Sequence, residues 1–204
     1  MKLSQDLLDR SERVILVALW AWFFTAIAQS FGQSHRAFDL LILGVETLTI
    51  VLVLMRRRSN TISTSPLDWA LAFGATAAPL LVRPIAGEGF GLGAYGAALM
   101  LLSIAMQCGA KLTLGRSFGV VPARREIVVR GPYKLVRHPI YASYLVGHAG
   151  FLILNPSVWN LGVYAFATSL QIARLLREER LLCASEEYQS YTSSVRYRLI
   201  PGVF

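Results

Sequence analysis

Six apolar runs constrain the fold of this chain more than any other feature of its sequence. A membrane-spanning helix needs about 20 mainly apolar residues, and runs that approach this length recur along the chain. They lie at residues 14–31, 37–55, 66–82, 91–108, 140–154 and 158–176. Only Asn155, Pro156 and Ser157 separate the last two runs, which is typical of the turn of a helical hairpin. The pattern predicts an all-α, polytopic integral membrane bundle of about five or six membrane segments, with a C-terminal helical hairpin and a cytosolic C-terminal tail.

The composition favours a membrane protein and excludes several other classes. The 204 residues are 54% hydrophobic and 16% charged, with a mean hydropathy of +0.50, whereas soluble domains have roughly 45–50% apolar and about 25% charged residues. A disordered chain, a collagen-like repeat and a disulfide-rich secreted module are excluded. Cys108 and Cys183 lack the spacing of a metal site, so we expect packing residues and no metal. The chain divides into N-terminal transmembrane helices at 1–108 and a basic, motif-rich region at 109–204.

The basic residues predict the orientation in the membrane. The net charge is +8, but the basic residues lie between apolar runs, which favours the anionic face of a bilayer over a nucleic acid. With the N-terminus inside, every Lys and Arg except Arg36 and Arg83 falls on the cytoplasmic side. Asp6, Asp9 and Glu12 precede the first run and argue against a cleaved signal peptide. We therefore expect an uncleaved protein of a bacterial inner (plasma) membrane with both termini in the cytoplasm.

Asp39, Glu46 and His148 are ionisable residues inside predicted spans. Asp39 and Glu46 are seven positions apart and so share one face of the second span. A charge at mid-bilayer costs about 2.5–3.5 kcal/mol, so Glu46, the deeper of the two, lines a functional cavity, makes a structural hydrogen bond or is a protonated carboxyl. His148 shares a face with Tyr141 and Tyr144, where a hydrogen bond between packed helices is the ordinary role of such a residue.

A glycine pattern opens the fourth run. The segment Gly91-Leu-Gly93-Ala-Tyr-Gly96 has the spacing of a dinucleotide-binding fingerprint. That fingerprint works only between a strand and a helix, and the sequence predicts no strand before it. We therefore interpret the glycines as small residues that let helices approach closely.

The segment at 131–141 carries the strongest functional signal. Its sequence is Gly-Pro-Tyr-Lys-Leu-Val-Arg-His-Pro-Ile-Tyr. The Gly131-Pro132 pair breaks the chain, and Pro139 fits the first turn of the next helix. Arg137 and His138 then lie at a helix N-terminus, which itself favours anions. The pattern indicates a site for a carboxylate or a phosphate; the alternative is a basic anchor beside the membrane with tyrosines at the interface.

The second signal ends the last apolar run, where the sequence at 174–180 reads Arg-Leu-Leu-Arg-Glu-Glu-Arg. Arg174 and Glu178 are spaced for an ion pair along one helix face, so a solvated helix end is the ordinary interpretation. The functional alternative is that Glu178 or Glu179 points back to bind a cation.

Together, these segments resemble the isoprenylcysteine carboxyl methyltransferase and phospholipid methyltransferase family of integral membrane methyltransferases. The resemblance begins at Leu114-Gly-Arg-Ser-Phe-Gly119, continues through residues 126–133 and 137–141, and ends with Glu178-Glu179, Tyr188, Tyr191 and Arg198-Leu-Ile-Pro201. It implies that the region at 109–204 is the catalytic part. The departures are a shortened segment before Tyr188 and Ala142-Ser143 after Tyr141, where many members have a glycine.

The resemblance implies S-adenosyl-L-methionine as the methyl donor, bound on the cytosolic side between the hairpin and the tail. The residues that it assigns to the cofactor pocket are Tyr133, Arg137, His138, Pro139, Tyr141, Glu178 and Glu179. The catalytic candidates are Arg137, Glu178, Glu179 and Glu46. This assignment agrees with elementary chemistry, because the cofactor has a carboxylate for Arg137 or His138, an ammonium for a glutamate and a sulfonium that tyrosine rings attract.

The methyl acceptor and two other functions stay open. We expect a lipophilic or lipidated acceptor from the bilayer; a carboxylate needs no general base, whereas an amine or a thiol needs Glu46 or a tail glutamate to take its proton. One alternative is an NADPH-dependent lipid or sterol-type reductase, in which Arg124, Arg125 and Arg130 bind a phosphate. The other is a non-enzymatic transporter or assembly protein, in which Glu46 and His148 mark a polar path.

Overall fold

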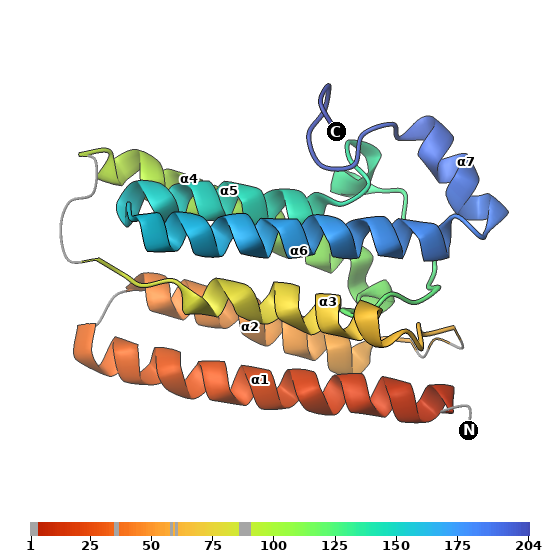
Figure 1. The fold of residues 1–204 in the computed structure, drawn as a ribbon, viewed down its shortest axis with the longest axis horizontal. Helices are drawn as coiled ribbons and strands as arrows, with labels where there is room; N and C mark the ends of the chain where they lie inside the picture. Colours follow the sequence, from red (N-terminus) through yellow and green to blue (C-terminus); the bar gives the residue numbers. More distant parts are fainter. Residues whose placement is uncertain (1–3, 35–36, 58, 60, 86–90) are drawn as a thin grey trace.

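The apolar runs form helices that alternate in direction through an elongated bundle (Figure 1). A computed structural model describes residues 4–34, 37–57, 59, 61–85 and 91–204. Over these residues the α-helices are α1 Gln5–Ser34, α2 Ala37–Met55, α3 Pro66–Ala77, α4 Gly93–Leu114, α5 Pro139–Leu154, α6 Val158–Leu182 and α7 Glu186–Ser194. Short 3-10 turns are η1 Ala78–Leu81, η2 Gly115–Ser117 and η3 Gly131–Lys134. Within the same ranges, β pairing is limited to one isolated bridge between Ile62 and Ala123, so the predicted all-α class is confirmed.

The alternation brings the predicted cytoplasmic segments to one end of the bundle. The start of α1, the chain after α2, residues 115–138 and α7 with the C-terminus all lie at the right-hand end in Figure 1. The α5–α6 turn lies at the opposite end. There, the Ser157 hydroxyl caps α6 by accepting a hydrogen bond from the backbone N–H of Asn160 at 3.0 Å. The predicted helical hairpin is therefore confirmed.

Several helices have the length and surface of membrane segments. Residues Gln5–Gln29 and Gly93–Ser117 are long and apolar enough to cross a bilayer, each with a mean hydropathy of 1.5, and Leu40–Met55 and Pro139–Leu154 are shorter apolar helices. Large apolar side chains also face outward, among them Val14, Trp22, Leu101 and Phe166. Apolar residues on the outer face of a bundle are typical of helices that contact lipid.

Glycines allow α4 and α5 to pack closely. A methyl group at Gly96 would lie 2.7 Å from the Cγ of Leu154, and one at Gly150 would lie 2.8 Å from the Gly96 carbonyl oxygen. The glycine pattern at 91–96 thus precedes and opens a packed helix, as predicted. Ser143, one of the departures from the family pattern, is fully buried in the same interface, where its carbonyl accepts a hydrogen bond from the Ser103 hydroxyl at 2.8 Å.

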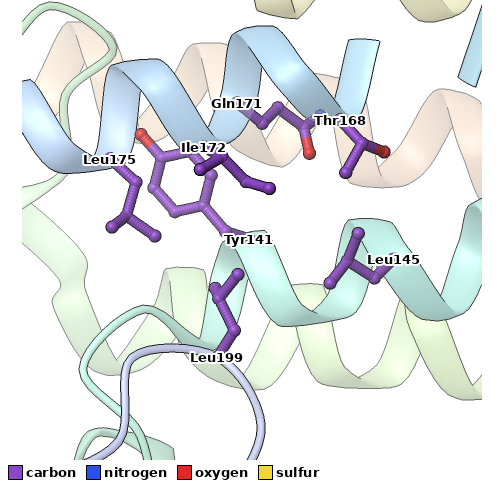
Figure 2. A pocket seen from close by; sticks show the side chains of 7 residues that line it. All are labelled: Tyr141, Leu145, Thr168, Gln171, Ile172, Leu175 and Leu199. Atoms are coloured by element: carbon purple, nitrogen blue, oxygen red, sulfur yellow. The ribbon is translucent and has the colours of Figure 1, made fainter. Parts of the chain in front are cut away.

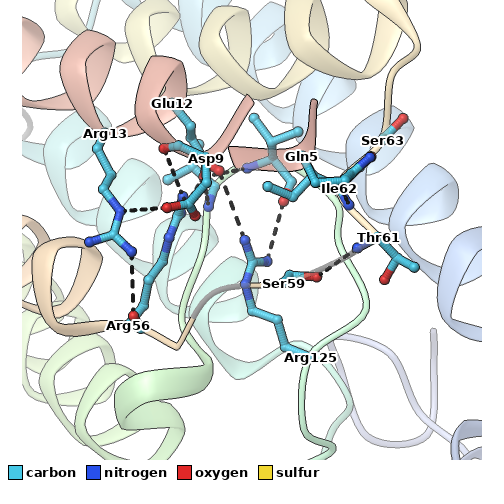
Figure 3. A network of polar contacts seen from close by, with 12 residues as sticks. Gln5, Asp9, Glu12, Arg13, Arg56, Ser59, Thr61, Ile62, Ser63 and Arg125 are labelled. Carbon is cyan, nitrogen blue, oxygen red and sulfur yellow. Dashed lines mark hydrogen bonds and ion pairs between the residues drawn. The ribbon is translucent and has the colours of Figure 1, made fainter. Parts of the chain in front are cut away.

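A buried charge network ties the N-terminus to the loop that follows α4 (Figure 3). Arg56 contacts Asp9 and Glu12 of α1, with nitrogen–oxygen distances of 2.7 Å for both pairs. Glu12 also accepts hydrogen bonds from the backbone N–H groups of Val120 and Val121, at 2.9 and 3.0 Å. Asp9 and Glu12 are therefore buried structural groups, and Glu12 positions the loop at 118–125, whereas Asp6 is exposed.

Candidate functional site

The segment that precedes α5 is held by the C-terminal tail. Gly131 has a φ of +54°, which favours glycine, and η3 follows directly. The backbone N–H groups of Arg137 and His138 donate to the carbonyls of Tyr197 and Arg198, each at 2.9 Å. These two hydrogen bonds align residues 137–138 with residues 197–198 beside the N-terminus of α5.

Glu179, near the end of α6, is the centre of a polar cluster. Its carboxylate contacts Arg137 Nη1 at 3.1 Å, His138 Nε2 at 3.1 Å and Arg198 Nε at 2.7 Å. The Tyr188 hydroxyl of α7 donates to it at 3.4 Å. The predicted anion position at the start of α5 is thus filled by a carboxylate of the chain itself, and the residues of the two sequence signals do meet.

The surroundings of Glu179 keep it ionised. Burial acts to raise the pKa of this carboxyl, but the hydrogen bonds from His138 and Arg198 and the charge of Arg137 outweigh it and lower the pKa to about 2. A group of this pKa is a very weak base at neutral pH, so Glu179 can attract cations but is unsuited to take a proton. Burial and the nearby Glu179 charge raise the pKa of Tyr188 well above its usual value, so this hydroxyl is a neutral donor.

Glu178 lies beside this centre and has a different partner. The Tyr141 hydroxyl donates to Glu178 Oε2 at 3.0 Å. Arg174 is buried, its guanidinium lies 5.3 Å from the centre of the Tyr141 ring, and it donates to the Val120 carbonyl. The expectation of a solvated helix end with an Arg174–Glu178 ion pair is therefore wrong, because α6 continues as a packed helix against α5 and the loop at 118–125.

Tyr133 and the tail are joined through α7. The buried Tyr133 carbonyl accepts a hydrogen bond from the Tyr191 hydroxyl at 2.7 Å, and the rings of Tyr188 and Tyr191 lie 5.7 Å apart. These contacts give the register of the shortened tail, in which Ser185 caps α7. Pro139 occupies the first position of α5, as predicted.

A narrow pocket between α5, α6 and the tail adjoins this cluster (Figure 2). It is lined by Tyr141, Leu145, Thr168, Gln171, Ile172, Leu175 and Leu199, and its walls lie so close together that it has almost no room for a water molecule. Gln171 is 5% exposed, and its side-chain oxygen has no hydrogen-bond partner in the part of the chain that the structure describes. Typical ligand pockets have a volume of about 300–1,000 Å³, so the walls of this narrow pocket would have to separate before a ligand could enter.

The polar residues inside the spans lie apart from the cluster. Glu46 is half-buried in α2 and lies nine residues before the end of that helix, a distance of about 14 Å along the helix axis. The side chain of Asp39 lies outside the described residues. His148 stacks on Tyr164 with 4.1 Å between ring centres, and its Nδ1 lies 3.4 Å from the Thr168 hydroxyl of α6, so the predicted hydrogen bond between packed helices is present.

Sequence reasoning missed Arg198 and Tyr188 as partners of Glu179. The sequence identified both residues only as part of the C-terminal tail that resembles the family. Their contacts with Glu179 join residues 9 and 19 positions apart and depend on how α7 folds back. Their signal was charge complementarity, since Glu179 needs cations once it is buried. Among the residues that the structure describes, no group of three or more His, Cys, Asp or Glu side chains is placed to hold a metal ion.

Two comparisons with known proteins bear on the family and the fold of the chain. The chain matches the phospholipid methyltransferase family over residues 88–189, half of its length. Among solved structures it is similar to a eukaryotic intramembrane Ras methyltransferase, an isoprenylcysteine carboxyl methyltransferase, with a TM-score of 0.54 and 18% identity over 81% of this chain and 66% of the other. At this identity the likeness shows the fold alone, and no curated protein matches the sequence. The family match and the shared membrane fold lead to one conclusion: the chain belongs to the phospholipid methyltransferase family of membrane methyltransferases.

Proposed function

We propose that this membrane methyltransferase uses S-adenosyl-L-methionine to methylate a lipophilic acceptor at the cytosolic face of the membrane. The observation that carries the proposal is the convergence of Arg137, His138 and Glu178 with the tail around Glu179. When bound, the cofactor supplies a methyl group that its sulfonium has already activated. The protein then has to align two reactants and exclude water, which can contribute about 7–11 kcal/mol to lowering the barrier.

The residues present fit the amino-acid end of the cofactor. The Arg137 Nε is buried and has no hydrogen-bond partner among the described residues, although Nη1 of the same side chain contacts Glu179. A free donor on a buried guanidinium matches a ligand carboxylate. Glu178 is half-buried and accepts a hydrogen bond from Tyr141, which leaves acceptor capacity for a ligand ammonium.

The two glutamates therefore have different proposed roles. Glu179 already has four donors, and three of them belong to buried side chains, whereas the Arg198 side chain is 34% exposed. We assign Glu178 to the ligand ammonium and Glu179 to the positioning of Arg137 and His138. If a ligand cation does reach Glu179, Arg198 is the partner that can leave with the smallest loss of packing.

The acceptor is proposed to reach the site from the bilayer between α5 and α6, where the closed walls of the pocket of Figure 2 would separate to admit it. That pocket is mainly apolar and shares Tyr141 with the polar cluster. Because Glu179 is a very weak base, the cluster favours an acceptor that is already anionic, such as a carboxylate. An amine or a thiol would depend on Glu178, or on Glu46 if the helices bring it closer.

The proposed placement in the cell follows from the charge distribution. We assign the end of the bundle that carries α7 to the cytoplasm of a bacterium, with both termini inside and about five or six segments in the membrane. In this arrangement residues 1–108 are the membrane anchor and residues 109–204 the catalytic region.

Titration calorimetry on the full chain in detergent tests the cofactor. S-adenosylhomocysteine and NADPH are titrated separately into the wild type, Arg137→Ala, Glu178→Gln and Glu179→Gln. Lys134→Gln is the matched control, because Lys134 is exposed and belongs to the same segment. We expect the adenosyl ligand to bind to the wild type and the control and to lose affinity in the three other variants.

Two outcomes of this titration would contradict the proposal. Binding of NADPH without the adenosyl ligand would replace the proposal with a reductase, and binding of neither ligand to folded protein would contradict cofactor use. Transfer of a labelled methyl group from S-adenosyl-L-methionine to a bacterial lipid extract then identifies the acceptor class.

A further inference from the structure

A second cleft, rich in arginine, lies outside the cluster around Glu179. It opens between the chain after α2, η2 and the loop that follows η2, and has a volume of about 390 Å³, within the range of ligand pockets. Its charged lining consists of Arg57, Arg116, Arg124, Arg125 and Glu126, and three hydroxyl side chains complete it. None of these residues belongs to the proposed cofactor site.

The positive charge of this cleft is poorly compensated. Arg57 contacts Glu126 at 2.5 Å, but the two side chains are 62% and 61% exposed, so the pair is weak. No ion pair reaches Arg116 or Arg124 from the described part of the chain; the Arg116 Nε donates only to a backbone carbonyl, that of Met55. Several guanidinium groups that share one hollow repel one another unless an anion joins them.

The fourth arginine forms the inner wall of the cleft. Figure 3 shows the Arg125 side chain reaching toward Glu12 in the buried network, with 3.8 Å between Nη2 and the carboxylate oxygen. Its guanidinium packs directly on Gly119, where an added methyl group would lie 2.3 Å from Cζ. Arg125 is thereby held in place, while Arg57, Arg116 and Arg124 are exposed at the mouth of the cleft.

We propose that this cleft binds the phosphate group of an anionic ligand. Guanidinium groups match phosphate oxygens in a planar, two-pronged geometry, and hydroxyl groups add donors. Arg57 and Arg116 each follow the end of an apolar helix by two residues, Met55 in α2 and Leu114 in α4, so we expect these two arginines at the depth of lipid headgroups. A phospholipid headgroup and a soluble phosphate are the two sources of this group.

The sequence pattern located only part of this site. It grouped Arg124, Arg125 and Arg130 as a phosphate cluster, but Arg130 does not line the cleft and instead donates to the Thr113 carbonyl at 3.3 Å. Arg57 and Arg116 come from distant segments that the fold brings together, with the Arg57 N–H donating to the Arg116 carbonyl at 2.9 Å.

Binding to the full chain in detergent tests the proposal. The probes are inorganic phosphate, a short-chain phosphatidylglycerol and a diacylglycerol with the same acyl chains but no phosphate. The variants are Arg116→Gln combined with Arg124→Gln, and Arg130→Gln as the matched control, an exposed arginine of the same loop outside the cleft. We expect the double variant to weaken phosphatidylglycerol binding by about tenfold or more, as the loss of charge-assisted hydrogen bonds predicts, and the control to leave it unchanged.

Each remaining outcome decides the proposal. Tighter binding of the lipid than of inorganic phosphate, with phosphate competing, assigns the headgroup as the source, and equal affinity assigns a soluble phosphate. Equal weakening by Arg130→Gln, equally tight binding of diacylglycerol or no binding of either phosphate probe would overturn it. Unchanged thermal unfolding of the double variant shows that the fold is retained, and the result is independent of whether S-adenosylhomocysteine binds.

Discussion

Glu179 makes the acid stability of the protein depend on its cationic partners. Its pKa of about 2 lies below the ordinary value of 4.5, so it stabilises the fold above pH 4.5 and this contribution is lost as the pH falls toward 2. Arg198→Gln removes one hydrogen bond to the carboxylate and raises its pKa, so thermal unfolding of this variant should lose stability at a higher pH than the wild type. Arg196→Gln, an exposed neighbour, is the control; identical acid profiles of all three proteins would contradict the assignment.

The buried side chain of Gln171 lowers the stability of the fold and places a polar group in the pocket. Its buried oxygen has no hydrogen-bond partner in the described chain, and such a group costs roughly 1–3 kcal/mol. Gln171→Leu keeps a similar volume and should raise the unfolding temperature in detergent. If the amide contacts the acceptor, the same variant should lower methyl transfer without changing the affinity for S-adenosylhomocysteine.

Thr168→Val is the matched control for Gln171, because it removes a polar group from the lining of the same pocket. A loss of stability in Gln171→Leu would show that the amide is satisfied in the native protein. Equal losses of methyl transfer in both variants would show that the pocket tolerates no change of polarity, so the effect would not be specific to Gln171.

At the scale of elements, the charge network of Figure 3 joins α1, α2 and the loop after α4. Arg56→Met leaves Asp9 and Glu12 without the cation that both contact, and removing one partner of a buried pair costs about 3–5 kcal/mol. Thermal unfolding should show this loss, and Glu12→Gln added to Arg56→Met should recover part of it. A double variant as unstable as the sum of the single variants would show that the two residues act independently.

The sequence predicted the helices well where apolar runs set their limits. The second run, 37–55, coincides with α2, and α5 begins one residue before the predicted 140. The last run was predicted to end at 176, but α6 continues to Leu182. Hydropathy alone ends a helix where charges begin. Inside the protein, however, Arg174 donates to the Val120 carbonyl and Glu179 contacts Arg137, His138 and Arg198, so the helix can continue.

The candidate site was predictable as a set of residues but not as a set of contacts. Proline, glycine and helix-end patterns are local, so they placed Arg137 and His138 at the start of α5 correctly. The pairing of these two residues with Tyr197 and Arg198 joins segments that are far apart in sequence, and no local pattern encodes it. The same reason explains why Arg57 and Arg116 were not foreseen as neighbours.

At the scale of the whole molecule, the bundle has two chemically different ends. The end with α7 holds the cluster around Glu179, the arginine-rich cleft and the charge network, whereas the α5–α6 turn lies at the other end (Figure 1). Cationic segments are retained on the cytoplasmic side of a membrane, so this asymmetry predicts one orientation. It also places both proposed ligand sites on the side where soluble cofactors and anionic lipid headgroups are found.

Cysteine labelling tests that orientation with residues at the two ends. Cys183 is exposed between α6 and α7, so the prediction that it is a packing residue is wrong. Val158, the first residue of α6, is 88% exposed beside the α5–α6 turn. In a Cys108→Ser background, a membrane-impermeant maleimide added to intact spheroplasts should leave Cys183 unlabelled until the membrane is permeabilised. Val158→Cys, in a protein that also carries Cys108→Ser and Cys183→Ser, should be labelled without permeabilisation, because the end of the bundle with the α5–α6 turn faces outward. The reverse pattern would invert the orientation and move both proposed sites away from the cytoplasm. Labelling of both positions in intact spheroplasts would place both ends of α6 outside and contradict a cytoplasmic C-terminus.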